Sequence, residues 1–200
     1  MSTVFFTSDE HIGHRNVLKF CNRPFSDLGE MKDKLISNHN SVVKPGDRVY
    51  HLGDMFWRTV PVKEALDYRY ALNGEHYFIW GNHDELIERN LILSKSFVWC
   101  RDVENLKVEG YPPIWLSHYA HRVWNGSHRG TWHLYGHSHS QLQEQNPTGA
   151  MDESPLSFDV GVDAVGYFPV SIDQVRAKMD AKHEKWNKFK WWQVKETDNG

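Results

Sequence analysis

Short apolar runs rich in β-branched and aromatic residues recur along the chain, which is typical of β-strands. Between them lie segments whose apolar residues repeat at helical spacing. The clearest of these begins at Asp27, which can cap a helix with Glu30 reaching back and with Leu28, Met31 and Leu35 on one face. The expected strands are 4–6, 48–52, 76–80, 114–116, 132–135 and 158–160, and the other expected helices are 60–72, 84–93 and about 171–187.

The alternation of strands and helices predicts an α/β protein, with the later strands adding an antiparallel part. A chain of 200 residues is most simply one domain, here 1–200. Ser171 and Gln174 form a capping box that opens the last helix, and the tail at about 195–200 is expected to be frayed. In such sheets ligands gather at the carboxyl ends of strands, so the residues directly after each apolar run are candidates for a site.

Side chains able to bind metal come after five of these runs. The first run is followed by Asp9 and His11, and the later ones by Asp54, by Asn82-His83-Asp84, by His118 and by His137-x-His139. Carboxylates, imidazoles and an amide without a thiolate suit divalent Mn, Fe, Ni or Zn better than an iron–sulfur cluster or structural zinc. Because residues i and i+2 of a strand point to the same side, Asp9 and His11 can grip one ion, while His137 and His139 can reach two neighbouring ions.

Composition and charge limit the classes of partner that the chain is expected to bind. With 40% hydrophobic and 24% charged residues the chain resembles an ordinary soluble globular protein, and its net charge of −3 provides no overall attraction for nucleic acid or for a membrane. A local basic patch remains open. No run is long and apolar enough to span a bilayer, the start lacks the features of a signal peptide, and two cysteines are too few for a disulfide framework. We therefore expect a cytoplasmic protein.

The motifs Asp9-x-His11, Gly53-Asp54-x-x-x-Arg58, Gly81-Asn82-His83-Asp84, His118 and Gly136-His137-x-His139 resemble, in this order, those of the calcineurin-like metallophosphoesterases. The resemblance covers roughly residues 3 to 165, and the run from Asp159 to Asp163 is similar to a strand of small bacterial and phage members. It implies two packed mixed β-sheets flanked by helices, a four-layer sandwich. It also implies two divalent metal ions, with Mn expected first.

The resemblance also implies roles for these residues. Asp54 would bridge the two ions, and a hydroxide between the ions would attack the phosphoryl group. His83 would face that group as a proton donor or a positive charge. Arg58 would orient loops or contact an anion, and Asp84 would hold His83 or the neighbouring backbone. The remaining ligands would divide into one set formed by Asp9, His11 and His139 and a second set formed by Asn82, His118 and His137.

Other polar residues near the motifs are less specific. His14 and His121 each lie three residues after a predicted ligand, so each can touch substrate, support a ligand or simply be solvated. Weaker candidates for phosphate contact are Arg15, Asn16, Arg23 and Arg122. The tail "WNKFKWWQVK" would suit stacking on single-stranded nucleic acid, but packing of a helix end onto the body explains it better.

The substrate is the least determined property, because the family hydrolyses monoesters, diesters, nucleic acids and pyrophosphates with one ligand set. A short chain without an obvious cap domain favours an open site. We therefore expect phosphodiesters, including cyclic or nucleotide ones, ahead of phosphomonoesters. Nucleic acid stays open as a substrate, as does the oligomeric state. A non-catalytic interaction module would be expected to lack some of the ligands or His83, and none is missing.

Overall fold

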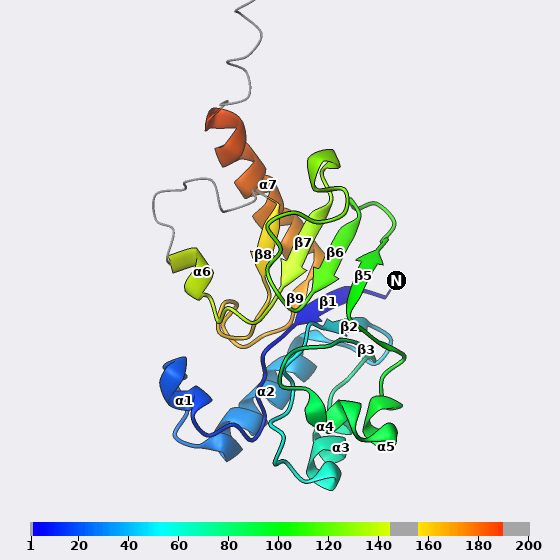
Figure 1. Ribbon diagram of the computed structural model, residues 1–200, viewed down its shortest axis with the longest axis vertical. Helices are drawn as coiled ribbons and strands as arrows, with labels where there is room; N and C mark the ends of the chain where they lie inside the picture. The colour runs from blue at the N-terminus through cyan, green and yellow to red at the C-terminus, as the bar shows by residue number, and fades with distance from the viewer. Residues whose placement is uncertain (1, 145–155, 190–200) are drawn as a thin grey trace, which may run out of the picture.

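Two mixed β-sheets lie at the centre of the computed structural model, which describes residues 2–144 and 156–189 (Figure 1). The first sheet has the order β4-β3-β2-β1-β9, in which β9 is antiparallel to β1 and the other neighbours are parallel. The second has the order β5-β6-β7-β8, in which only β5 is antiparallel to its neighbour. The strands are β1 Val4–Thr7, β2 Arg48–His51, β3 Glu75–Ile79, β4 Cys100–Arg101, β5 Val103–Leu106, β6 Ile114–Ser117, β7 Trp132–Tyr135, β8 Ser157–Asp159 and β9 Val170–Ser171.

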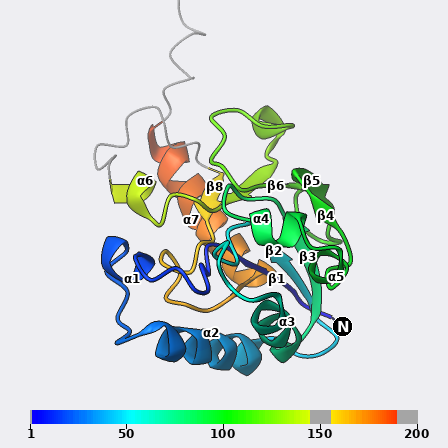
Figure 2. The same ribbon diagram turned by 60° about the horizontal axis from the view of Figure 1, so that its bottom comes forward.

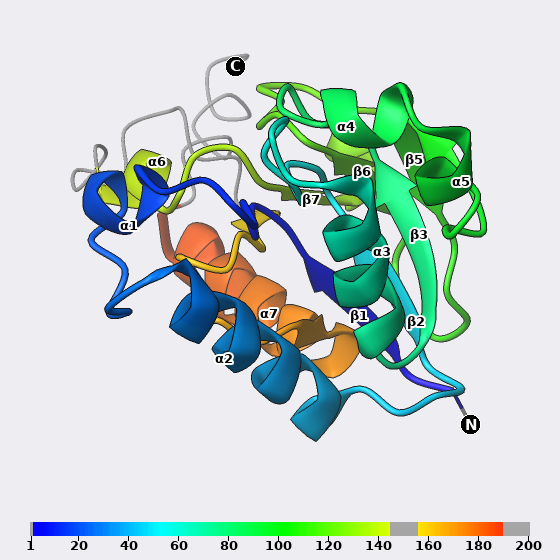
Figure 3. The same ribbon diagram turned by 90° about the horizontal axis from the view of Figure 1, so that it is seen from below.

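Helices flank the sheets, as predicted. Two of them, α2 (Leu28–Val42) and α3 (Val62–Ala71), lie on the side of the first sheet that faces the viewer when the molecule is seen from below (Figure 3). A third, α7 (Ile172–Phe189), contacts β8, β9 and β1. Along β1, Val4 and Phe6 belong to the core shared with the second sheet, whereas Phe5 packs with apolar residues outside that core. This alternation follows from the two-residue period of a strand, and it joins the two sheets into a sandwich.

The predicted helix starts at Asp27 and Ser171 are confirmed. The Asp27 side chain accepts a hydrogen bond from the backbone N–H of Glu30 at 2.9 Å. Ser171 and Gln174 bond each other's backbone N–H groups reciprocally. The single helix predicted over 84–93 is wrong, because the chain forms α4 (Glu85–Glu88) and α5 (Leu91–Ser94) instead. Asn90 separates them with an extended backbone and caps α5 through the N–H of Leu93 at 3.1 Å.

The carboxyl ends of β1, β2, β3, β6 and β7 carry all of the predicted ligands. The chain leaves β1 toward α1 (Val17–Phe20), which lies on the same side of the molecule as α6 (Gln141–Glu144) (Figure 2). A short 3₁₀ helix, Ser127–Arg129, interrupts the connection from β6 to β7. In the described ranges no helix combines the length and apolarity needed to span a membrane. The predicted frayed tail and most of the tryptophan-rich segment fall outside the described residues.

Candidate metal centre

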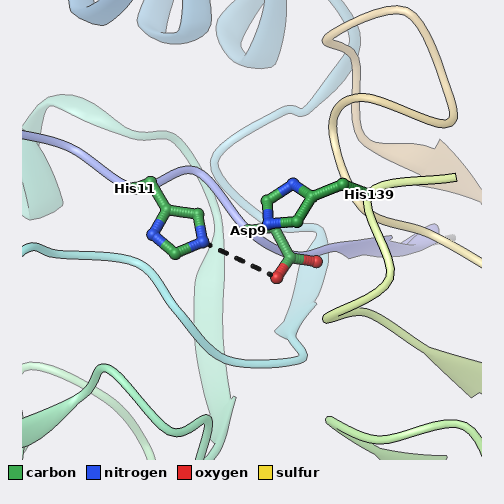
Figure 4. Close-up of side chains that lie close together, drawn as sticks. All are labelled: Asp9, His11 and His139. Atoms are coloured by element: carbon green, nitrogen blue, oxygen red, sulfur yellow. Dashed lines mark ion pairs between the residues drawn. The ribbon is translucent and has the colours of Figure 1, made fainter. Parts of the chain in front are cut away.

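The structure gathers six of the seven predicted ligands into two groups of three. Asp9, His11 and His139 form the first group, drawn in Figure 4, and Asp54, His118 and His137 form the second. Within each group the ligand atoms lie within 4.8 Å of one another. In the first group Nε2 of His11 is 4.0 Å from Oδ1 of Asp9. Residues from both sheets therefore converge on two adjacent positions that can each hold an ion.

Asp54 connects the two groups. Its Oδ2 lies 3.6 Å from Nε2 of His11 and 3.5 Å from Nε2 of His118, so one oxygen faces a ligand of each group. Its Oδ1 accepts a hydrogen bond from the backbone N–H of His83 at 2.8 Å, which fixes the carboxylate. A ligand shared by two ions has to lie in such a position.

Asn82, the seventh predicted ligand, lies beside the second group and contacts a residue that the motifs do not reveal. Its Oδ1 is 3.0 Å from Nε2 of His118 and accepts a hydrogen bond from the hydroxyl of Tyr119 at 3.3 Å. The Tyr119 ring also lies 4.7 Å from the ring of His137 and 5.0 Å from that of His118, and the residue is 49% exposed. An aromatic residue directly after His118 was the only sign of this contact in the sequence.

Hydrogen bonds select the ring nitrogens that are left to bind metal. Nδ1 of His118 is 2.7 Å from the carbonyl oxygen of Leu52, to which it donates its proton. Nδ1 of His139 is 2.6 Å from the carboxylate of Asp163. In both rings Nε2 therefore remains for an ion, which is how proteins commonly orient metal-bound imidazoles.

The donor set fits divalent ions. His11 is buried, and neither of its ring nitrogens has a hydrogen-bond partner among the described residues. Burial, together with repulsion from the His139 cation, lowers the pKa of His11 to about 2, so the ring is neutral and able to ligate. Burial also raises the pKa of Asp9 well above its usual value, and Asp159 and Asp54 add to this effect. Buried polar atoms without a hydrogen-bond partner, such as the ring nitrogens of His11, lower the stability of the fold. A bound cation would provide the missing partner.

Backbone conformation gives a second indication of function. Five predicted ligands lie in the left-handed region, with φ of 61° at Asp9, 51° at His11, 58° at Asp54, 66° at His137 and 46° at His139. Such a conformation costs a non-glycine residue about 1–3 kcal/mol and persists where surrounding contacts impose it. Here it aims successive ligands into one small volume.

Asp84 holds two ligand-bearing loops together. Its Oδ2 accepts the backbone N–H groups of Asp54 and Gly81 at 2.8 and 2.7 Å, and its Oδ1 accepts that of Met55 at 3.1 Å. Burial and the nearby Asp54 charge raise the pKa of Asp84 to about 7, although these three donors act in the opposite direction. The contacts agree with the expectation that Asp84 holds neighbouring backbone.

His83 and His14 lie beside the first group of ligands. The ring of His83 is 5.5 Å from that of His11 and 5.2 Å from that of Trp57. His14 stacks on Trp57 at 3.9 Å, with its ring 5.4 Å from that of His11. The exposed guanidinium of Arg58 lies over the same tryptophan, 5.4 Å from its ring centre.

His121, in contrast, lies apart from the ligands. Its backbone N–H donates to Nε2 of His133, and its Nδ1 accepts from the indole N–H of Trp115. Arg15, Asn16 and Arg122 are exposed, so phosphate contact by these three stays a prediction.

Arg23 is not available for phosphate contact, which corrects the expectation from sequence. Its guanidinium is buried and bonds Asp163 and the backbone carbonyls of Asp9 and Glu10. Cys21 lies with His139 and Asp163 in a third group of potential ligands. Because Asp163 already bonds Arg23 and His139, we assign it to orienting His139.

Comparison with known proteins agrees with this geometry. The sequence model of the calcineurin-like phosphoesterases matches residues 2–194. The chain belongs to this family. The family and the two ligand groups identify a metal-dependent phosphoesterase, and members of the family typically bind two divalent ions.

Three similar proteins share most of their length with this chain. The uncharacterized protein MJ1445 of Methanocaldococcus jannaschii is 33% identical over 175 residues, which are 88% of this chain and 90% of that protein. The Gene 66 protein of Mycobacterium phage L5 is 26% identical over 208 residues, covering 92% of this chain and 97% of its own. The solved structure of AQ665 from Aquifex aeolicus, a protein of unknown function, has a TM-score of 0.68 at 22% identity and covers 88% of this chain and 99% of its own. This last likeness concerns the fold alone.

Proposed function

We propose that this protein hydrolyses phosphodiesters, including cyclic or nucleotide ones, at a site that holds two divalent ions, with Mn²⁺ as the first candidate. The observation that carries the proposal is the position of Asp54, whose Oδ2 faces His11 of one ligand group and His118 of the other. Bound there, two ions would activate a water molecule for in-line attack and hold the phosphoryl oxygens.

The residues of the chain would prepare the substrate for this attack. Asp54 would keep both ligand groups at a fixed separation, since its second oxygen is bonded to the backbone of His83. The same bond would fix the position of the His83 backbone, and His83 is only partly buried, so its ring is available to a substrate. From there it would donate a proton to the departing oxygen or stabilise negative charge on the phosphoryl group.

Aromatic surfaces beside both ligand groups support a diester, which carries a substituent on each side of phosphorus. Asn82 and His137 are exposed, so the second ligand group opens to solvent. Tyr119 provides an aromatic surface beside that group, and the His14–Trp57 stack provides one beside the first. Planar substituents such as nucleosides would pack favourably against both.

Phosphomonoesters are the second candidate, and the exposed Arg58 guanidinium beside the first group favours them. A monoester carries more negative charge than a diester and gains more from a nearby cation.

A reconstitution assay tests both candidates. Metal-free protein is loaded in turn with Mn²⁺, Fe²⁺, Ni²⁺ and Zn²⁺ and assayed on bis-p-nitrophenyl phosphate, p-nitrophenyl phosphate, cyclic nucleotides and a dinucleotide. We expect kcat/KM to be higher for diesters, and to be lost in Asp54→Asn. Preferential hydrolysis of monoesters would overturn the diester assignment. A protein holding two ions that hydrolyses none of these esters would overturn the proposed function.

A further inference from the structure

Arg23 forms a buried junction between Asp163, which bonds one ligand of the first group, and the turn that carries the other two ligands. Arg23 is 5% exposed, and its Nε and one terminal nitrogen donate to the two oxygens of Asp163 at 2.8 and 2.7 Å. The guanidinium also donates to the backbone carbonyl of Asp9 at 2.7 Å and to that of Glu10 at 2.9 Å. One cation thus contacts two segments, the first at Asp163, 140 residues away from Arg23, and the second at the turn of Asp9 and Glu10.

The first segment reaches the metal position through His139. Both carboxylate oxygens of Asp163 accept hydrogen bonds from the Arg23 guanidinium. This carboxylate accepts the proton on Nδ1 of His139 and leaves Nε2 for an ion. Because both oxygens of Asp163 are bonded to Arg23, the orientation of His139 depends on a residue that does not touch the ion.

The second segment is the turn from Asp9 to His11, where both ligands have positive φ. A strained turn keeps its conformation only while other contacts hold it. Two carbonyls of this turn accept hydrogen bonds from Arg23. Loss of the guanidinium would therefore free the backbone that aims Asp9 and His11.

We propose that Arg23 is a positioning residue for one of the two ions, the one held by Asp9, His11 and His139. All three ligands of that group depend on it, directly through the turn or through Asp163. In the second group, His118 is oriented by the carbonyl of Leu52 instead. The inference rests on the two-ion site of the proposed function, and it concerns binding of metal rather than hydrolysis of substrate.

The planar fork of arginine is essential to this role. Its N–H groups point in fixed directions and here reach a carboxylate and two carbonyls at once, whereas a lysine ammonium is a compact point charge on a flexible stem. Arg23→Lys keeps the charge and loses the fork. Arg69→Lys is the matched control, because Arg69 is also buried, at 6% exposure, and donates to the carbonyl of Ser96 away from the ligands.

The experiment measures Mn²⁺ binding without substrate. Calorimetry and elemental analysis give the affinity and number of sites, electron paramagnetic resonance distinguishes isolated from coupled Mn²⁺, and thermal unfolding of the metal-free proteins reports stability. In Arg23→Lys we expect about 10–100-fold weaker binding at one site, the usual effect of removing a partner that orients a ligand. The other site should keep its wild-type affinity. When only one Mn²⁺ is bound, the resonance spectrum should match that of Asp9→Asn, which changes a ligand of the first group. It should differ from that of His118→Ala, which removes a ligand of the second group.

Arg69→Lys should keep two sites of wild-type affinity, whatever its stability. Asp163→Asn is the second variant if Arg23→Lys does not fold, and it should weaken the same single site. Equal weakening of both sites in step with lower thermal stability would reduce Arg23 to a structural role and overturn the proposal. Unchanged affinity at both sites would overturn it as well. Neither result depends on which phosphate ester the protein hydrolyses.

Discussion

The carboxylate of Asp9 accepts hydrogen bonds from the backbone N–H of His137, with Oδ1 at 3.0 Å and Oδ2 at 2.9 Å. The two residues are 128 positions apart and lie in loops that follow strands of different sheets, β1 and β7. Asp9 is therefore both a candidate ligand and the acceptor that positions the loop carrying His137 and His139. Assembly of the metal centre and packing of the two sheets depend on the same contact.

Gly136 makes this contact possible, so Gly136→Ala should disrupt it. A Cβ at this position would lie 2.1 Å from Oγ of Ser8 and 2.5 Å from Oδ2 of Asp9. We expect a loss of about 1–3 kcal/mol in stability, the usual cost of overpacking, and weaker metal binding in the Asp9 group. Chemical denaturation and elemental analysis would measure both, with Gly46→Ala as control because open space surrounds Gly46. Full metal content in Gly136→Ala would contradict this account.

Asp54→Asn should be more harmful than loss of any ligand at the edge of the centre, since Oδ2 of Asp54 faces both ligand groups. We expect both ions to be lost and kcat to fall by more than the roughly 10–100-fold typical of removing a ligand's partner. Asn82→Ala should weaken the binding of one ion only. Asp67→Asn removes an exposed carboxylate paired with Lys63 and controls for the change in charge. Two ions and normal turnover in Asp54→Asn would show that Asp54 does not bridge.

Metal binding should release protons. Hydrogen bonds of the His139 ring with Asp163 and Cys21 outweigh burial and raise the pKa of His139 to about 10, so its ring is protonated at neutral pH in the metal-free protein. An ion must displace that proton, and affinity should therefore rise with pH until about 10. Calorimetry in buffers of different ionisation enthalpy would count the protons. Asp163→Asn should release fewer protons when it binds metal. A metal affinity that does not change between about pH 5 and 8 would contradict the prediction.

Acid should destabilise the fold through buried neutral histidines. Burial lowers the pKa of His133 to about 4 and also lowers those of His39, His51 and His76. Between about 6.5 and 4 the unfolded chain binds protons that the folded chain does not, so the free energy of unfolding falls as pH falls. His133 alone would contribute up to about 1.4 kcal/mol per pH unit. Chemical denaturation across this range would measure the free energy of unfolding at each pH. Its dependence on pH should be shallower in His133→Gln than in the wild type or in His128→Gln, where the histidine is exposed. Equal slopes in the three proteins would contradict the prediction.

The positions of the candidate ligands could be predicted from the sequence because each follows a strand. Asp9, Asp54 and His118 come directly after apolar runs, and the carboxyl ends of parallel strands meet at one edge. The helix caps at Asp27 and Ser171 were equally local signals. Position relative to a strand is encoded within a few residues, so pattern alone is sufficient.

The contacts that hold the ligands could not be predicted in this way. Arg23 looks like a surface cation in sequence, yet it is buried against Asp163, 140 residues away. Tyr119 gains its role only when the loop after β6 meets Asn82. Strands β4 and β9 are two residues long, too short to show a period, and their pairing depends on neighbours from elsewhere in the chain.

His83 should reveal its role through the leaving group. Its ring lies beside His11, and its backbone donates to Asp54, so His83 is placed next to the candidate metal positions without being one of the predicted ligands. If His83 protonates the departing oxygen, His83→Ala should lower kcat by about 10²–10⁴-fold on an alkyl phosphodiester. On bis-p-nitrophenyl phosphate the loss should be much smaller, because p-nitrophenolate leaves without a proton.

The control for this comparison is metal content, which should stay at the wild-type value in His83→Ala because the predicted ligands are unchanged. His14→Ala provides a second reference, since His14 stacks on Trp57 close to the same ligands. If His14→Ala lowers kcat less than His83→Ala does, and by the same factor on both esters, the loss in His83→Ala reflects proton donation and not a general disturbance of the site. Equal losses on both esters in His83→Ala would instead assign His83 to stabilising charge on the phosphoryl oxygens. No loss on either would remove His83 from the mechanism.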